Sequence, residues 1–460
     1  MSKGLLPPQL KRYKISIDDS DWISPPNNSR ALKVKLNTND KADEVILQLK
    51  GIKQLELVAD GSDDFTGSKQ SVSLDALFSL ESLSLEDLNL EKICNVPLSA
   101  GSFRQLRTIT MHNCHKLTNI FSFSIDRVLP NLQAIEVSCC ENMEEIFAIE
   151  REDDVNNTQL IHEIEFSQLC SVTLRRLPQL KSVCHRVKTT SQMQLTSSTN
   201  DGDIISEDII DIPKSLFNEK VVFPNLETLK ISSISAERIW HNQLPTMSSS
   251  FQNLNRLLVH NCDNLKELFP SSMVNGFVQL QYIQIYECSR LEEMVFMEEL
   301  RAEEKKDIQF PFLKEMKITS CPNFKTFISD DKIGFPSLKA MDIQGCPKFK
   351  EFIFNDKVAV PNLEKLEIFY MDNLEKIWHN QIVKDSFCKL KSLEVKCCRR
   401  LLNVFPSNIH GRLLSSLESL EVDECDSLEE IFDLGELSNY DSQILILPLA
   451  NLQKLSVSWM

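Results

Sequence analysis

The sequence predicts an α/β solenoid, in which repeated units stack side by side and each unit adds one strand to a parallel sheet. Three observations point to this fold. A unit of 25 to 28 residues recurs along a chain of 460 residues, apolar residues alternate inside each unit, and cysteine returns at one fixed offset. A unit this short cannot bury its apolar residues alone, so neighbouring units must stack.

The repeated unit begins with Phe, Leu or Val and has apolar residues at fixed positions on both sides of a cysteine. In the first clear copy these residues are Phe103, Leu106, Ile109, Met111, Cys114, Leu117, Ile120 and Phe121. Further clear copies begin at Leu129, Phe251, Phe277, Phe310, Phe335, Val360, Phe387 and Leu414. Looser copies begin at Leu77, Phe166 and Phe223, and a partial one at Leu449. The spacing is typical of leucine-rich repeats, except that two residues instead of one follow the cysteine.

Each unit should contain one short strand and one returning segment. Ile109 and Met111 are separated by one residue, which is the period of a strand with one buried face, so Thr110 points outward. We expect these strands to form the concave parallel sheet of a horseshoe, with short helices or irregular turns on the convex side. A proline near the start of the next unit, such as Pro130, ends the convex segment.

Eight cysteines occupy the turn position directly after the strand, and we expect them to form a structural ladder. This inward position has to satisfy backbone groups that leave the sheet, and a small thiol packs there and makes weak hydrogen bonds. We expect free thiols and no metal, because no histidine set has zinc spacing. The eight are Cys114, Cys140, Cys262, Cys288, Cys321, Cys346, Cys398 and Cys425.

The chain divides into four predicted segments. Residues 1–48 lead into the repeats, 49–187 are leucine-rich repeats, 188–220 are a mobile polar and acidic insertion, and 221–460 are further repeats. Ile239-Trp-His-Asn-Gln recurs from Ile377, which indicates duplication of a block of several repeats. The last repeat is incomplete and lacks a polar cap, so we expect an open sheet edge and poor solubility.

The composition disfavours several classes of function. The chain has 11 glycines, which is few for a protein with phosphate-binding loops. Its 50 basic and 66 acidic residues give a net charge of −16, which disfavours binding to nucleic acid or to an anionic membrane. The sequence shows no signal peptide and no membrane span, which favours a cytoplasmic location. No phosphate-loop, dinucleotide, zinc-protease or nucleophile-elbow motif occurs, so we expect no enzyme and no cofactor.

The outward positions of the predicted sheet form the candidate binding surface, because a solenoid offers a wide sheet to one partner. Aromatic side chains beside arginine have the composition of interface hot spots. The alternative is that scattered apolar surface residues have no function. The candidate protein-binding residues are Arg256, Leu258, His260, Tyr282, Tyr286 and Phe369.

The units Phe103-Arg-Gln-Leu…Met111-His-Asn-Cys-His-Lys-Leu and Phe387-Cys-Lys-Leu…Val395-Lys-Cys-Cys resemble the C-terminal repeats of plant coiled-coil, nucleotide-binding, leucine-rich-repeat disease-resistance proteins. Segments from Leu10 and Ser29 resemble the same region, so the resemblance covers nearly the whole chain. It implies innate immunity in the cytosol: the repeats recognise a pathogen effector or guarded host protein and restrain the receptor's own nucleotide-binding domain.

The family's coiled-coil and nucleotide-binding regions are not in this sequence, so the resemblance brings no ATPase switch to it. We therefore expect a non-enzymatic protein-binding module of plant defence. The alternative is a generic leucine-rich-repeat interaction scaffold, such as a ubiquitin-ligase substrate receptor. A substrate receptor needs an adaptor-binding helical module upstream, and residues 1–48 do not look like one.

Overall fold

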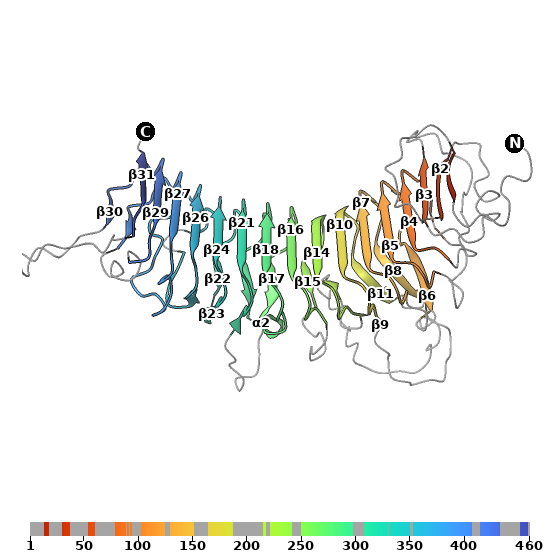
Figure 1. Cartoon of the computed structure of the whole chain (residues 1–460), viewed down its shortest axis with the longest axis horizontal. Coiled ribbons are helices and arrows are strands. Elements are labelled where there is room, and N and C mark those ends of the chain that lie inside the picture. Colours follow the sequence, from red (N-terminus) through yellow and green to blue (C-terminus); the bar gives the residue numbers. More distant parts are fainter. Residues whose placement is uncertain are drawn as a thin grey trace, which may run out of the picture. The chain divides into compact units, whose positions relative to one another are not determined.

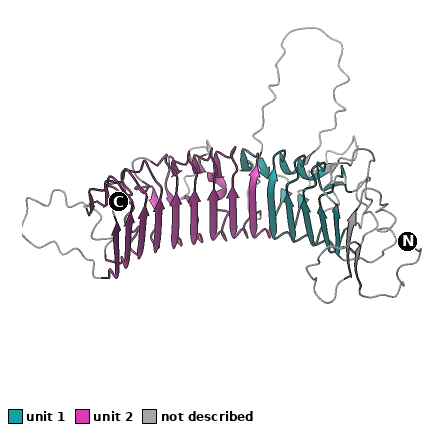
Figure 2. Cartoon of the chain, turned by 90° about the horizontal axis from the view of Figure 1, so that it is seen from above, with its two compact units in different colours: residues 1–223, 236–244 teal, residues 224–235, 245–460 magenta. Residues whose placement is uncertain are grey.

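The structure is a computed structural model, and the chain forms two compact units that we describe separately (Figure 2). Unit 1 comprises Met1–Phe223 and Ala236–Leu244, and unit 2 comprises Pro224–Ser235 and Pro245–Met460. The structure describes residues 13–17, 30–36, 54–59, 79–88, 90, 91, 93, 103–124, 129–150, 164–186, 215–217, 221–241, 250–297, 308–329, 331–349, 353–406, 415–432 and 451–458.

The main sheet of unit 1 is parallel, and its strands follow one another in chain order (Figure 1). They are β1 (Tyr13–Ile17), β2 (Arg30–Leu36), β3 (Gln54–Ala59), β4 (Ser82–Glu86), β5 (Thr108–His112), β7 (Ala134–Ser138) and β10 (Ser171–Leu177). Behind this sheet the returning segments pair into smaller parallel sheets. These contain β6 (Phe121–Ser124), β8 (Glu145–Glu150), β9 (Ile164–Glu165), β11 (Ser182–Arg186), β12 (Ser215–Phe217), β13 (Val221–Val222) and β15 (Arg238–Trp240).

Unit 2 repeats the same plan, with a parallel main sheet in chain order (Figure 1). Its strands are β14 (Thr228–Ile234), β16 (Arg256–His260), β18 (Tyr282–Tyr286), β21 (Glu315–Thr319), β24 (Ala340–Gln344), β26 (Lys365–Phe369), β27 (Ser392–Lys396), β29 (Ser419–Asp423) and β31 (Lys454–Ser458). The returning segments contain β17 (Glu267–Pro270), α2 (Ser271–Val274), β19 (Glu293–Phe296), β20 (Ile308–Gln309), β22 (Thr326–Ile328), β23 (Ile333–Gly334), β25 (Val358–Ala359), β28 (Asn403–Phe405) and β30 (Glu430–Phe432).

One strand per repeat in a parallel sheet confirms the predicted leucine-rich-repeat solenoid. The returning segments differ from the expectation of helices or irregular turns. Within the described residues they are mainly short strands, and α2, with four residues, is the one helix. The reason lies in their apolar pairs: Phe121 pairs with Phe147, and Phe269 pairs with Val295, so successive repeats extend a second ladder. Aromatic and β-branched residues favour such strands.

The core lies between the main sheet and the returning segments. On β18 the inward residues Ile283 and Ile285 are fully buried, whereas their neighbours are half-buried, as strand alternation requires. Phenylalanine rings stack behind the sheet from one repeat to the next. In unit 2 the centroid of Phe310 lies 5.2 Å from that of Phe269 and 5.7 Å from that of Phe335. The core is therefore continuous between repeats.

The chain leaves most main-sheet strands through one residue with a positive φ angle. Asn261, with φ 50°, donates its backbone N–H to the carbonyl of Tyr286 at 2.8 Å, and so extends the ladder by one bond. Glycine adopts this conformation most easily, yet among the described turns of this kind Gly345 is the one glycine. The repeat therefore does not need glycine at this turn, because other residue types adopt the positive φ angle there. This agrees with the low glycine content of the chain. The residues are Asp87, Asn113, Cys139, Arg176, Ser233, Asn261, Glu287, Ser320, Gly345, Tyr370, Cys397 and Glu424.

The eight predicted ladder cysteines all lie in the core, with at most 4% of each residue exposed. Each thiol donates to the carbonyl of the residue two positions earlier, at the end of the strand. For Cys288 this acceptor is Tyr286, at 3.4 Å. Burial raises the pKa of the Cys346 thiol to about 12. Hydrogen bonding with a neighbouring ladder thiol instead lowers the pKa of Cys140, Cys262, Cys321 and Cys425. From the burial and the hydrogen bonds to the strand carbonyls we propose that these thiols close the turn.

The predicted segment boundaries stay predictions. The insertion at 188–220 lies outside the described residues except for residues 215–217, which form β12. Within residues 1–48 the structure describes β1 and β2, which pair in parallel with each other, and β2 pairs with β3. The strand β2 contains the alternating Leu32, Val34 and Leu36.

Thiol reactivity tests the buried ladder. In the native chain we expect Ellman's reagent to modify the exposed Cys388 quickly, whereas Cys262, Cys288 and Cys321 react only after unfolding in guanidinium. Peptide mass mapping of the modified protein, with and without denaturant, measures this difference. If a ladder cysteine reacted in the native chain as fast as Cys388, its thiol would be accessible, contrary to the structure.

The phenylalanine stack predicts a difference between two nearby rings. Phe310 is fully buried, whereas Phe312 has 50% of its surface exposed. Phe310→Ala should lower the free energy of unfolding by about 3–5 kcal/mol through the cavity that it leaves. Phe312→Ala, the matched control, should change it by about 0.5 kcal/mol or less. Urea unfolding followed by circular dichroism measures both, and equal effects would contradict the assigned core.

Candidate functional site

The candidate site is the open face of unit 2, by which we mean the outward side chains of its main-sheet strands. Parallel pairing in register places these side chains in rows that cross the strands. Arg256 pairs with Tyr282, and His260 pairs with Tyr286, so the four predicted residues on β16 and β18 do lie beside one another. The predicted Leu258 lies between them on β16 and is half-buried.

Cations cover both tyrosine rings of β18. The guanidinium carbon of Arg256 lies 4.5 Å from the ring centroid of Tyr282. The ammonium of Lys317, on the neighbouring strand β21, lies 5.9 Å from the ring centroid of Tyr286. Such cation–π contacts hold each aromatic ring in one orientation. The rings of Tyr282 and Tyr286 therefore each face a cation from a neighbouring strand.

His260 completes this arrangement at the end of the strands. Its ring packs edge-on against Tyr286, with 6.3 Å between centroids, and its Nε2 lies 3.1 Å from a carboxylate oxygen of Glu287. Its Nδ1 lies 3.4 Å from the hydroxyl of Ser232 on β14. We call Arg256, His260, Tyr282, Tyr286 and Lys317 the aromatic group. Sequence reasoning named four of its members and missed Lys317, which only the register brings beside Tyr286.

The predicted Phe369 does not join the aromatic group. It lies at the end of β26, and β21 and β24 separate β26 from β18. The ammonium of Lys396, on β27, lies 5.8 Å from its ring centroid. The next residue, Tyr370, has 60% of its surface exposed and a φ angle of 55°, which is uncommon for a bulky side chain. Phe369 and Tyr370 thus form a second aromatic contact group.

Sequence reasoning missed Tyr370 because it followed only the three outward positions of each strand. Tyr370 occupies the next position, which is the left-handed residue of the turn. In neighbouring repeats this position holds Gly345 and Cys397, so an aromatic residue stands out when the repeats are aligned. That alignment is the signal that could have found it.

Charged side chains occupy the middle of the open face. One outward residue from each strand, β14 through β29, forms what we call the central row. Paired strands are in register, so neighbours in this row lie opposite one another. The central row consists of Lys230, Leu258, Gln284, Lys317, Asp342, Glu367, Glu394 and Glu421.

Lysines at the margins hold the acidic side chains of the central row. Lys396 lies 2.5 Å from Glu394 and 2.7 Å from Glu421, and Lys454 contacts Glu421 at 2.7 Å. Hydrogen bonds from these two lysines lower the pKa of the Glu421 carboxyl to about 2. Hydrogen bonds to the two glutamates raise the pKa of Lys396. These groups therefore stay ionised at neutral pH.

The open face of unit 1 has a different character. Hydroxyl groups dominate it: Thr108 donates a hydrogen bond to Ser82 at 2.8 Å, and Ser138 lies 2.9 Å from the ring nitrogen of His112. Arg175 lies 3.8 Å from the carboxylate of Glu136. Small residues that hydrogen-bond to one another present little apolar area on β4, β5 and β7.

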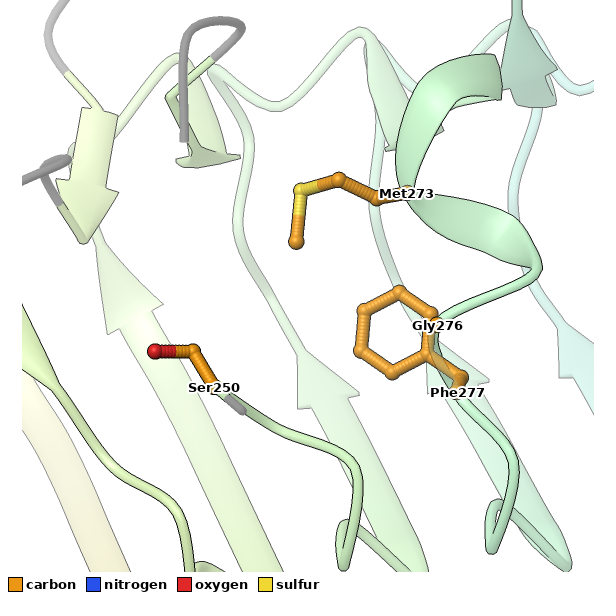
Figure 3. Close-up of a pocket in the computed structure, with 4 residues that line it drawn as sticks. All are labelled: Ser250, Met273, Gly276 and Phe277. Carbon is orange, nitrogen blue, oxygen red and sulfur yellow. The ribbon is translucent and has the colours of Figure 1, made fainter. Parts of the chain in front are cut away.

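A small hollow lies beside α2 in unit 2 (Figure 3). It is lined by Ser250, Met273, Gly276 and Phe277, and its volume of about 10 Å³ is close to that of one water probe. It is therefore too small for a substrate. In the part of the chain that the structure describes, no group of three or more His, Cys, Asp or Glu side chains is arranged to hold a metal ion. No described helix is long and apolar enough to span a membrane.

Comparisons with known proteins give a family match. A family model described as plant disease resistance protein RPS2-like, leucine-rich repeats, matches residues 45–197, 225–370 and 362–460. Probable disease resistance protein At4g27220 of Arabidopsis thaliana is 33% identical over 114 residues, which cover 24% of this chain and 12% of that protein. Disease resistance protein At4g27190 of Arabidopsis thaliana is 28% identical over 121 residues, which cover 26% of this chain and 11% of that protein.

These matches span about one eighth of the length of the curated relatives. A solved structure, "Crystal structure of TLR13-ssRNA13 complex", aligns with 86% of this chain and 76% of that chain. The identity is 12% and the TM-score is 0.14.

The ion pairs of Glu421 predict a pH dependence. Its pKa in the fold, about 2, lies below the ordinary value of 4.5, so the pairs stabilise the fold above about pH 4.5. This contribution is lost as the pH falls toward 2. Glu421→Gln should lower the urea midpoint at pH 7, and its difference from the parent should shrink between about pH 4.5 and about pH 2. The control Glu429→Gln should show no such trend. A difference independent of pH would contradict the assignment.

Proposed function

The chain belongs to the leucine-rich-repeat family of RPS2-like plant disease resistance proteins, and from this membership we propose that it is a non-enzymatic recognition module of plant defence. Its partner is a pathogen effector or a guarded host protein. The partner binds the open face of unit 2, through the aromatic group and through Phe369 and Tyr370. Family membership supports the role in plant defence, and the geometry of the open face supports the choice of surface.

The aromatic group is the observation that carries this proposal. Tyr282 and Tyr286 lie on one strand, fixed by Arg256 and Lys317, and tyrosine and arginine are the residue types that dominate binding energy at protein interfaces. In the described part of unit 1, by contrast, the open face carries hydroxyl groups on β4, β5 and β7 and a contact between Arg175 and Glu136. The anchors for a partner are therefore concentrated in unit 2.

The spacing of the two aromatic contact groups supports a protein as the partner. Three strand intervals separate β18, which carries the two tyrosines, from β26, and strands lie about 4.8 Å apart, so the tyrosines lie roughly 14 Å from the second group. A protein surface of ordinary interface size covers both groups.

A second partner follows from family membership. In a longer receptor of this family, the repeats would contact the receptor's own nucleotide-binding domain and restrain it. The non-enzymatic part of the proposal is supported by the family. A cytoplasmic location, which the absence of a signal peptide in the sequence favours, belongs to the same proposal.

The anchors can be tested once a partner is found by screening plant effectors and host proteins against the whole chain. Tyr282→Ala with Tyr286→Ala should weaken binding about 30-fold or more, because hot-spot side chains contribute about 2 kcal/mol or more. Isothermal titration calorimetry measures the dissociation constant. Phe369→Ala, tested separately, should also weaken binding, because the partner contacts the second group, and an unchanged dissociation constant would remove that group from the binding surface.

Phe312→Ala serves as the matched control, because Phe312 is an exposed aromatic residue outside the main-sheet strands. Its removal should leave the dissociation constant unchanged. If the partner bound the double tyrosine variant as tightly as the parent chain, and the variant kept its circular dichroism spectrum, the open face of unit 2 would not be the binding surface.

A further inference from the structure

The open face of unit 2 carries opposite charges at its two ends. On β14, β16, β18 and β21 the cations are Lys230, Arg256 and Lys317, and the carboxylate is Glu315, so this half has a net charge of about +2. The tyrosines of the aromatic group lie in this basic half, between the cations.

The second half is acidic. The strands β24, β26, β27 and β29 carry five carboxylates and two lysines, and β31 adds Lys454, so this half has a net charge of about −2. The carboxylates are Asp342, Glu367, Glu394, Glu421 and Asp423, and the lysines are Lys365 and Lys396. Four of these carboxylates are consecutive members of the central row, so the acidic character follows one line across the strands.

The sign changes between two adjacent strands. Lys317 on β21 and Asp342 on β24 are neighbours in the central row, and their charged groups are 2.7 Å apart. The lysines of the acidic half lie at the margins of the strands, where they hold the carboxylates toward the middle. Lys365 contacts Glu367 at 3.0 Å in this way. The two halves therefore meet at a fixed boundary with ordered side chains on both sides.

We propose that the open face of unit 2 binds an extended polypeptide segment of its partner whose charges have the opposite order. Acidic residues of the segment lie over β14 to β21, and basic residues lie over β24 to β29. This inference rests on the proposed function and names the chemistry of the partner. Charge complementarity is its basis, because like charges facing one another across an interface are strongly unfavourable.

The length of the segment follows from the spacing of the strands. Seven strand intervals separate β14 from β29, which corresponds to roughly 34 Å. An extended chain advances about 3.3 Å per residue, so about ten residues cross the whole face. About five residues lie over each half. The partner segment therefore has about ten residues, with an excess of acidic residues in one half and an excess of basic residues in the other.

Two synthetic peptides with identical composition test the order of charge. The first has four glutamates, two prolines and four lysines, and the prolines keep the oppositely charged blocks apart. The second has the same residues with glutamate and lysine alternating. Both have no net charge from their side chains, so attraction to the acidic chain as a whole does not distinguish them. Fluorescence anisotropy of labelled peptides with the full chain, at low ionic strength, measures both affinities.

We expect the blocked peptide to bind at least about threefold more tightly than the alternating one, and this preference to vanish at high salt. Glu394→Gln with Glu421→Gln should abolish the preference. Glu429→Gln with Glu430→Gln changes the net charge equally but lies outside the main sheet, and should keep it. Lys230→Gln with Arg256→Gln tests the basic half independently, and should also abolish the preference.

Equal affinity for the two peptides in the parent chain would overturn the inference. Equal loss of preference in the face variants and in the control variant would overturn it as well, because binding would then follow only net charge. Sedimentation experiments would show whether the chain forms dimers that dissociate at high salt. If such dimers formed in the parent chain and not in the face variants, the occupant of the face would be a second copy of this chain, contrary to the inference. The proposed function is tested separately, by whether Tyr282→Ala with Tyr286→Ala weakens binding of the protein partner.

Discussion

The in-register backbone ladder between successive repeats is the constraint on which the rest of the structure depends. Because each strand pairs with the next at the same offset, one position in the repeat becomes one row across the sheet. Inward rows hold the apolar core, the turn row holds the cysteines, and outward rows hold the residues available to a partner. A single shift in register would exchange buried and exposed rows, and would place Leu257 and Val259 in solvent.

The repeated offset explains how much of the fold could be read from the sequence. Ile109 and Met111 predict the strand, and Cys114 predicts the turn. Every repeat has to bury the same apolar positions and to provide hydrogen bonds for the same backbone groups, so the pattern recurs. The strands behind the main sheet were harder to foresee, since short apolar pairs such as Ile120 and Phe121 fit a helix, a turn or a strand equally well. Pairing with the next repeat decides among them, and such pairing is not visible within one repeat.

The candidate site was predictable to a lesser degree, for a related reason. Tyr282 and Tyr286 could be placed on the outward face from strand alternation alone. The partners that orient them come from other strands, so Lys317 emerged only from the register. Long charged side chains also reach beyond their own row, as Lys396 does when it contacts Glu394 and Glu421 together. Side-chain reach of this kind depends on rotamers that the sequence pattern does not fix.

The inward and outward rows have different roles in this chain. The inward rows and the cysteine turns use residues that carry no recognition chemistry, and the outward rows of unit 2 collect aromatic and charged side chains held by their neighbours. Hydroxyl-radical footprinting of the chain with and without its protein partner tests the resulting claim most directly. We expect Tyr282, Tyr286 and Tyr370 to lose most of their oxidation in the complex. Unchanged oxidation of these residues, with protection confined to the strands behind the main sheet, would contradict recognition through the open face of unit 2.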